Sequence, residues 1–267
     1  MTLVNTKRWL ENHYDDPITI CEKIRAYFKN EGVTASEIYD FLSMNGMYKP
    51  EKNKTDHLNA FINCEFWEIV SKERKALKKE WDVPNIPIFI LPSDRRNKMI
   101  TKDYNGKSGI AFSDKLFLFL SDTNSAKEVK AVFTHEYNHV YRLSKNKKNE
   151  RKYHLLDTII LEGLAENAVL ERLGETEMAN WTTYYSTKQL ERFWIKLILP
   201  NINLTQEDHL YHRLLYGIGH YPKMLGYCVG YHLVNQYLRN NDLKVSDIIE
   251  LPSEEFILKT PNSPTTE

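Results

Sequence analysis

At 267 residues the chain is long enough to bury a sizeable core, and its 36 Lys and Arg balance its 36 Asp and Glu, so the formal net charge is zero. This balance argues against a nucleic-acid partner, because nucleic-acid-binding proteins usually carry a basic excess. No segment has the apolar length of a signal peptide or of a membrane-spanning helix. The three cysteines, Cys21, Cys64 and Cys228, are scattered without disulfide or zinc spacing. We therefore predict a cytoplasmic protein with no membrane partner.

Residues 1–80 have the hydrophobic spacing of helices. Apolar side chains recur three or four residues apart between charged ones, as at Trp9, Ile20, Ile24 and Phe28. The polar stretch at 51–54 predicts a solvated loop. We expect residues 1–80 to form a helical N-terminal region and residues 81–267 to form the domain that carries the chemistry.

A small sheet is predicted where the character of the sequence changes, near residue 83. Residues 86–92 are a β-branched and aromatic run closed by prolines, which is typical of a strand. Residues 109–112 and 115–120 predict a hairpin. The fold class is therefore α+β and mainly helical.

Helices dominate the rest of the chain. Ser125 and Glu128 have the spacing of a capping box, and the helix that they open is predicted to run to about residue 143. After a lysine-rich loop at 145–152, a second helix is predicted over 154–173, with Gly174 as its stop. Further helices are predicted at 188–198, 207–215 and 223–238, and the polar end of the chain from Pro261 is expected to fray.

The first of these helices contains the motif HExxH, as His135, Glu136 and His139. Residues four apart lie on one face of a helix, so both imidazoles can reach one Zn²⁺ ion. Glu136 is rotated by about 100° from His135, which places it beside the ion, where it can take a proton from metal-bound water. The alternative is a surface helix on which these residues coincide by chance.

A catalytic zinc site needs a third protein ligand, and the second helix offers two carboxylates. Glu162 and Glu166 share an apolar stripe, whereas Asn167 and Glu171 point the opposite way. Burying an ionised carboxylate is costly unless it is paired or binds a metal. We expect Glu162 to be the third ligand and Glu166 to orient a ligand imidazole. Gly163 is expected to allow close approach to the first helix.

Other assignments remain open or fit less well. Glu162 and Glu166 could exchange roles, or both could pair with buried Arg or Lys. The longer motif HExxHxxGxxH would need glycine at position 142 and histidine at position 145, where the chain has Arg142 and Lys145. Asp157 faces away from the glutamate stripe. The pattern favours a glutamate as third ligand.

The segments HEYNHVYR and ILEGLAEN resemble the gluzincin clan of metallopeptidases, in which HExxH is followed by a helix carrying ExxxD or ExxxE. The chain also resembles a bacterial family of predicted zinc-dependent proteases, through KRWLENHYDDPITICEKI, ASEIYDFLSMNGMY and GYCVGYHLV. The resemblance implies a zincin-like metallopeptidase fold with Zn²⁺ as cofactor. Glu166 stands where aspartate is common in the clan.

Peptide hydrolysis also needs a donor for the tetrahedral oxyanion. Tyr227 and Tyr231 lie one turn apart in the predicted last long helix, in which Gly226 and Gly230 permit close packing. They are the leading candidates, and His220 is the third. The alternative for each tyrosine is aromatic packing.

We therefore expect a zinc metallopeptidase that hydrolyses peptide bonds with Glu136 as general base. In gluzincin-like folds a sheet edge pairs with extended substrate, and the resemblance assigns that edge to residues 115–120, which implies a peptide or protein substrate. The alternative is a catalytically inactive, zinc-stabilised binding or regulatory protein. The sequence indicates no oligomeric state.

Overall fold

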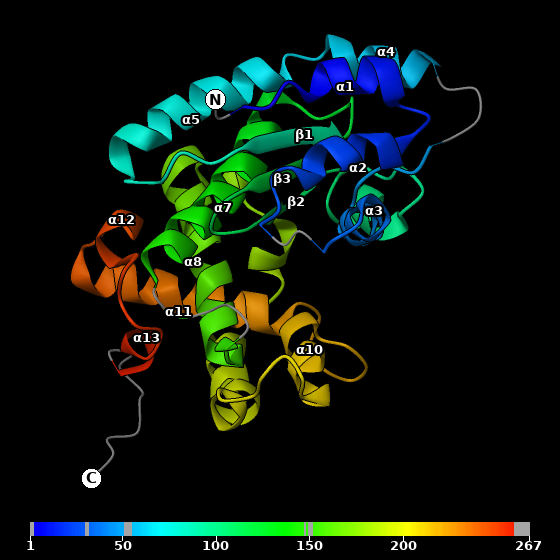
Figure 1. Ribbon diagram of the computed structural model, residues 1–267. Coiled ribbons are helices and arrows are strands. Elements are labelled where there is room, and N and C mark those ends of the chain that lie inside the picture. The colour runs from blue at the N-terminus through cyan, green and yellow to red at the C-terminus, as the bar shows by residue number, and fades with distance from the viewer. Residues whose placement is uncertain (1–2, 30–31, 51–54, 147, 149–151, 259–267) are drawn as a thin grey trace. The chain divides into compact units, whose positions relative to one another are not determined.

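The computed structural model describes residues 3–29, 32–50, 55–146, 148 and 152–258 (Figure 1). They divide into two compact units, Met1–Val140 and Tyr141–Glu267, and the boundary falls inside helix α7 (Ala126–Lys145). The loop expected at 51–54, half of the lysine-rich loop and the chain end from Pro261 lie outside the described residues. The predicted domain boundary near residue 80 stays a prediction.

Before residue 81 the regular elements that the structure describes are all helices, as the hydrophobic spacing predicts. Asp16 accepts a hydrogen bond from the backbone of Thr19 and so caps a helix that begins at Pro17, while Thr34 and Glu37 form a capping box. The five helices are α1 (Thr6–His13), α2 (Pro17–Arg25), α3 (Ala35–Met44), α4 (Thr55–Asn63) and α5 (Phe66–Glu80).

The small sheet has three strands in the order β1 (Ile88–Pro92), β3 (Leu116–Leu120), β2 (Ser108–Ala111). The short helix α6 (Lys98–Asp103) precedes β2. β3 pairs in parallel with β1 and antiparallel with β2, so the predicted hairpin is confirmed. The expectation that residues 115–120 provide a sheet edge is wrong, because β3 is the central strand. Within this unit β2 is an edge strand, whereas the outer side of β1 meets Leu3.

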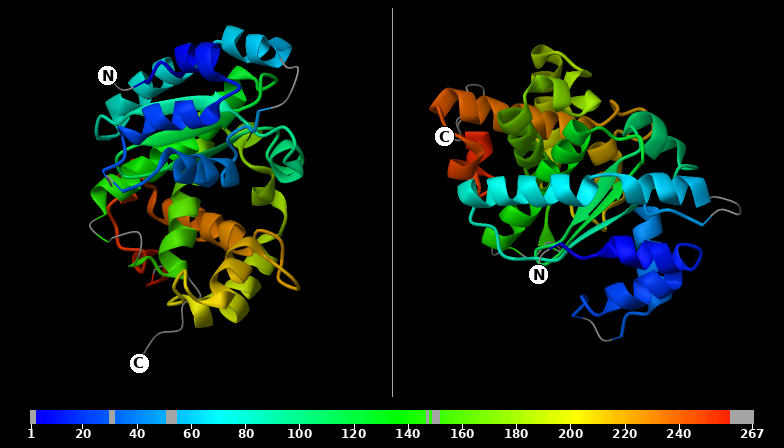
Figure 2. Two further views of the ribbon diagram at one scale, coloured as in Figure 1. Left: turned by 45° about the vertical axis from the view of Figure 1, so that its right-hand side comes forward. Right: turned by 90° about the horizontal axis from the view of Figure 1, so that it is seen from above.

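Both faces of the sheet are covered, because all residues of β1 and β3 are buried. On one face Phe89 and Phe117 stack with their ring centroids 4.6 Å apart. Trp9 of α1 and Tyr27, just after α2, lie against Phe89. Figure 2 shows α1, α2 and α3 (blue) gathered on one side of the strands.

Helix α7 begins with the predicted capping box. The backbone N–H of Ser125 donates to the Glu128 carboxylate at 2.9 Å, and the Ser125 hydroxyl accepts from the backbone N–H of Glu128 at 3.3 Å. Phe133 and Tyr137 are buried and stack with their ring centroids 5.0 Å apart. Trp81, which directly follows α5, stacks on Tyr137 with ring centroids 6.3 Å apart, and this contact orients α7 within the first unit.

The second unit is helical. The predicted second helix is confirmed as α8 (Leu155–Leu173), which ends at Gly174. The other α-helices are α9 (Thr187–Phe193), α10 (His209–Tyr216), α11 (Leu225–Asn241), α12 (Val245–Ile248) and α13 (Glu255–Leu258). A single π-turn, Trp194–Ile198, continues α9. None of the helices that the structure describes in either unit has the length and apolar composition needed to cross a membrane.

Helices α8 and α11 cross in close contact at two glycines (Figure 1). A Cβ atom on Gly163 would lie 2.3 Å from the carbonyl oxygen of Gly230, and one on Gly230 would lie 1.8 Å from that of Ile159. The close approach expected of Gly163 is therefore made to α11 rather than to the HExxH helix.

The buried side-chain amide of Asn167 connects the two helices at this crossing. The Asn167 side chain donates to the backbone carbonyls of Gly163 at 2.8 Å and Tyr231 at 3.2 Å, and accepts from Asn235 at 2.7 Å. The expectation that Asn167 faces away from the core is wrong, because α11 covers that side of α8.

The end of the described chain is tied to buried charges of the second unit. The Arg142 guanidinium donates to the backbone carbonyl of Ile249. Asp157 accepts hydrogen bonds from the Ser253 hydroxyl at 2.9 Å and from the backbone N–H of His154 at 2.9 Å. Arg142, Asp157 and Ser253 are all buried. Asp157 also pairs with Lys148 at 2.5 Å, so the C-terminal segment supplies one of its several partners.

Gly230→Ala should lower the free energy of unfolding by about 1–3 kcal/mol, because the added methyl group has no room beside the Ile159 carbonyl. Urea denaturation measures the change. Asn240→Ala, at the exposed end of the same helix, is the control and should change stability by less than about 0.5 kcal/mol. Equal stabilities of the Gly230→Ala protein and wild type would contradict the described crossing.

The three cysteines should differ in reactivity. Burial raises the pKa of both Cys21 and Cys228 to about 12, so their reactive thiolate forms are scarce at pH 8. Burial also raises the pKa of Cys64, but this thiol is partly exposed and therefore open to the reagent. Native protein should release one equivalent of thionitrobenzoate rapidly from Ellman's reagent, and denatured protein three. Cys64→Ser should abolish the rapid phase; a rapid phase that survives this change would contradict the assignment.

Candidate metal centre

The two histidines of HExxH lie one turn apart on α7. Their ring centroids are 4.7 Å apart and the ring planes are inclined at 86°. His139 is buried and His135 is partly exposed. A helix that presents two imidazoles on one side, one of them near the surface, can supply two nitrogen ligands to one ion.

Glu136 lies on α7 beside this pair and against the edge strand β2. A Cβ atom on Gly109 would lie 2.4 Å from Cγ and 2.8 Å from Oε1 of Glu136. Only glycine allows the strand and the carboxylate to come so close. The strand thus fixes a buried acid next to the two histidines.

In the second unit, α8 carries Glu162 and Glu166 one turn apart. Glu162 is partly exposed, and its charge contributes to the raised pKa of Tyr216, although partial burial of the hydroxyl is the larger cause. Glu166 is buried, and its Oε1 accepts a hydrogen bond of 2.6 Å from the backbone N–H of Ala179. Its predicted contact with a ligand imidazole stays a prediction.

His135, His139 and Glu162 form a group that could hold a metal ion. Each offers one ligand atom, two ring nitrogens and one carboxylate oxygen, and these atoms all lie within 4.8 Å of one another. No other group of three such side chains was found among the residues that the structure describes. These are the three side chains that the sequence analysis names as metal ligands, and their role as ligands stays a prediction.

The three candidate oxyanion donors have different surroundings within the second unit. The Tyr231 hydroxyl points to the sulfur of Met178 at 3.6 Å. The Tyr227 ring packs against Trp181 and Tyr216, with ring centroids 5.5 and 5.8 Å apart. His220 is exposed, in the loop between α10 and α11. Their assignment as donors stays a prediction.

Tyr216 lies near Tyr227 and Glu162, and the sequence analysis did not identify it as a candidate. It is the last residue of α10, held by the left-handed Gly217 that follows it, and its side chain shares a hydrogen bond with Tyr227. The ring is half-exposed, and the charge of Glu162 acts on its hydroxyl. The sequence indicates this position only weakly, as a tyrosine directly before a glycine that ends a helix.

The chain belongs to the family described as "Predicted Zn-dependent protease (DUF2268)", whose profile matches residues 66–258. This range includes both the HExxH helix and α8.

Two relatives come from Bacillus subtilis (strain 168). The uncharacterized protein YjaZ is 41% identical over 220 residues, which cover 82% of this chain and 84% of YjaZ. The uncharacterized protein YjfC is 23% identical over 195 residues, which cover 69% of this chain and 64% of YjfC. No solved structure matches the chain.

Gly109→Ala should destabilise the protein by about 1–3 kcal/mol, because the new methyl group collides with the Glu136 side chain. The same change made in a Glu136→Ala background should cost less than half as much, since Cγ and the carboxylate are then gone. Urea denaturation of the four proteins gives this double-mutant cycle. Additive effects would show that Gly109 and Glu136 are not in contact.

Proposed function

We propose that this protein is a zinc-dependent metallopeptidase in which His135, His139 and Glu162 hold the ion. The grouping of these three ligand atoms supports the proposal most directly. Two imidazole nitrogens and one carboxylate oxygen are the ligand set of one class of catalytic zinc site, and they leave a fourth position open. When bound, zinc would make water acidic near neutral pH and would polarise the peptide carbonyl.

Glu136 is the proposed general base. Glu136 is not one of the three grouped ligands. It directly follows His135, and its side chain packs closely against the backbone of Gly109. A carboxylate so placed can take a proton from the attacking water and pass it to the leaving amine. A zinc site with a structural role alone has no use for such a base.

The substrate is proposed to be a peptide or protein in extended form. β2 is the edge strand of the sheet in its unit, and its Gly109 lies directly against Glu136. An extended peptide that added to an edge strand would have its backbone aligned with that strand. β2 therefore replaces residues 115–120 as the strand that is proposed to pair with the substrate backbone.

Among the proposed oxyanion donors, Tyr227 has the strongest support. It is hydrogen-bonded to Tyr216, which lies within the electrostatic influence of Glu162. A hydroxyl pair of this kind can donate to a developing negative charge. Tyr231 donates to a thioether, a weak acceptor that it could exchange for a better one, and His220 would have to turn inward from solvent.

Glu136→Gln tests the proposal. Zinc content, measured by mass spectrometry of dialysed protein, should stay near that of wild type, while hydrolysis of a fluorogenic peptide library should fall by about 10²–10⁴-fold. His139→Ala should lose zinc as well as activity. Glu11→Gln, an exposed acid on α1, is the matched control and should alter neither.

Each contrary result has a definite meaning. Hydrolysis that survives Glu136→Gln would remove the base. Wild-type protein that holds zinc but cleaves no peptide would support the alternative, a zinc-stabilised binding protein. Wild-type protein that takes up no zinc would end the proposal.

A further inference from the structure

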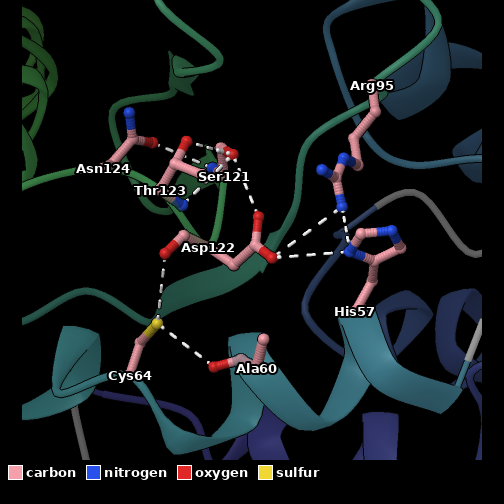
Figure 3. A network of polar contacts seen from close by, with 8 residues as sticks. All are labelled: His57, Ala60, Cys64, Arg95, Ser121, Asp122, Thr123 and Asn124. Atoms are coloured by element: carbon pink, nitrogen blue, oxygen red, sulfur yellow. Dashed lines mark hydrogen bonds and ion pairs between the residues drawn. The ribbon is translucent and has the colours of Figure 1, made fainter.

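A network of polar side chains surrounds Asp122 in the first unit, just after β3 (Figure 3). Arg95 and His57 lie 3.8 and 3.6 Å from the Asp122 carboxylate, and the Cys64 thiol donates to the backbone carbonyl of Asp122 at 3.7 Å. These contacts connect α4 and the residue after it to the segments that follow β1 and β3. The network has partners of its own, so we assign it a structural role.

The second unit has a different kind of surface feature, a pair of exposed apolar side chains between α10 and α11. Tyr216, the last residue of α10, is 42% exposed, and Ile218, two residues later, is 52% exposed. Exposed apolar surface that is grouped rather than scattered can mark a binding site. The question is therefore what these two side chains could bind.

The backbone that carries Ile218 has a defined conformation. Gly217 and Gly219, on either side of it, have φ angles of +72° and +80°, in the left-handed region that favours glycine. The backbone N–H of Met224 donates to the carbonyl of Tyr216 at 2.9 Å and so closes the loop between α10 and α11. Ile218 is thus presented at a fixed place in a closed loop.

The ring of Tyr216 is held by its neighbours. It stacks with His212, with ring centroids 6.1 Å apart and planes inclined by 8°, and its centroid lies 5.8 Å from that of Tyr227. The two tyrosine side chains also share a hydrogen bond. A ring that is held in this way and still half-exposed offers an apolar surface that loses little freedom when a ligand covers it.

Helix α10 places this surface beside Glu162. The hydroxyls of Tyr211 and Thr158 are hydrogen-bonded at 2.5 Å, and Thr158 lies one turn before Glu162 on the same face of α8. Tyr216 follows Tyr211 by little more than one turn of α10. Burial and, second, the charge of Glu162 raise the pKa of Tyr216, so the two side chains lie within electrostatic reach of each other.

We propose that Tyr216 and Ile218 form the specificity site for a large apolar side chain of the peptide substrate, at a residue next to the bond that is cleaved. The inference rests on the proposed function, because Glu162 marks the position of that bond only if it is a metal ligand. A phenylalanine or leucine side chain would cover the Tyr216 ring and the Ile218 methyl groups, and removing this apolar surface from water favours binding. A glycine would gain nothing there.

Peptide binding to the full-length Glu136→Gln protein, which should not cleave what it binds, tests the site. Two fluorescein-labelled Ser–Ala decapeptides differ in one central residue, phenylalanine or glycine, and fluorescence anisotropy gives both affinities. The phenylalanine peptide should bind about tenfold more tightly or better. Adding Tyr216→Ala should reduce this ratio to about threefold or less, and Ile218→Ala should reduce it by at least about half. Tyr216→Phe should preserve it, because the ring remains.

Ile195→Ala is the matched control, because Ile195 is 48% exposed in the π-turn that continues α9. It should leave the ratio unchanged. Circular dichroism of each variant shows whether it is folded, and if Tyr216→Ala is not, Ile218→Ala decides. Equal affinity for the two peptides, or an equal loss in Ile195→Ala, would overturn the specificity site.

Cleavage of a peptide library by the wild-type protein separates this inference from the proposed function. We expect a preference for phenylalanine or leucine at one position beside the cleaved bond, and its loss in Tyr216→Ala. Cleavage without such a preference, or with one that survives Tyr216→Ala, would overturn the specificity site and leave the peptidase standing. No cleavage at all would overturn the proposed function and this inference with it.

Discussion

Buried carboxylates are the constraint on which the architecture around the candidate centre depends. Glu136 and Glu166 lie on largely apolar helices and are almost inaccessible to water, where an uncompensated negative charge would be severely destabilising. Part of the compensation is visible in the fold itself, because Glu166 receives the backbone N–H of Ala179. A bound cation would supply more, since it would draw the histidines and an acid of α8 around a positive charge.

Glycine is the means by which the chain brings backbone and functional side chains together. Gly109 lets an edge strand touch Glu136, and Gly163 lets α8 meet α11 beside Glu162. In both places the glycine φ angle is ordinary for its element, so the requirement is for space rather than for an unusual conformation. Any larger residue at these positions would shift Glu136, the proposed general base, or the helix that carries Glu162, the proposed ligand.

Local and periodic features were predictable from the sequence, whereas pairings between distant segments were not. The Ser125 capping box and the stop at Gly174 depend on neighbouring residues, and the Glu162 stripe follows from helical periodicity. The central position of β3 depends on which strands pair, and the burial of Asn167 depends on α11, more than 50 residues later. Tyr216 was missed for the same reason: only the folded second unit brings it under the influence of Glu162.

The contacts of Arg142 and Asp157 give the last described segment a structural role. Ile249 supplies a carbonyl to a guanidinium enclosed by protein, and Ser253 supplies a hydroxyl to an enclosed carboxylate. A chain shortened to end before residue 249 would lose the acceptor of the Arg142 guanidinium and one donor to Asp157, which would keep its contacts with Lys148 and the His154 backbone. The final turns are thus an interior component of the second unit, and a functional truncation has to leave them in place.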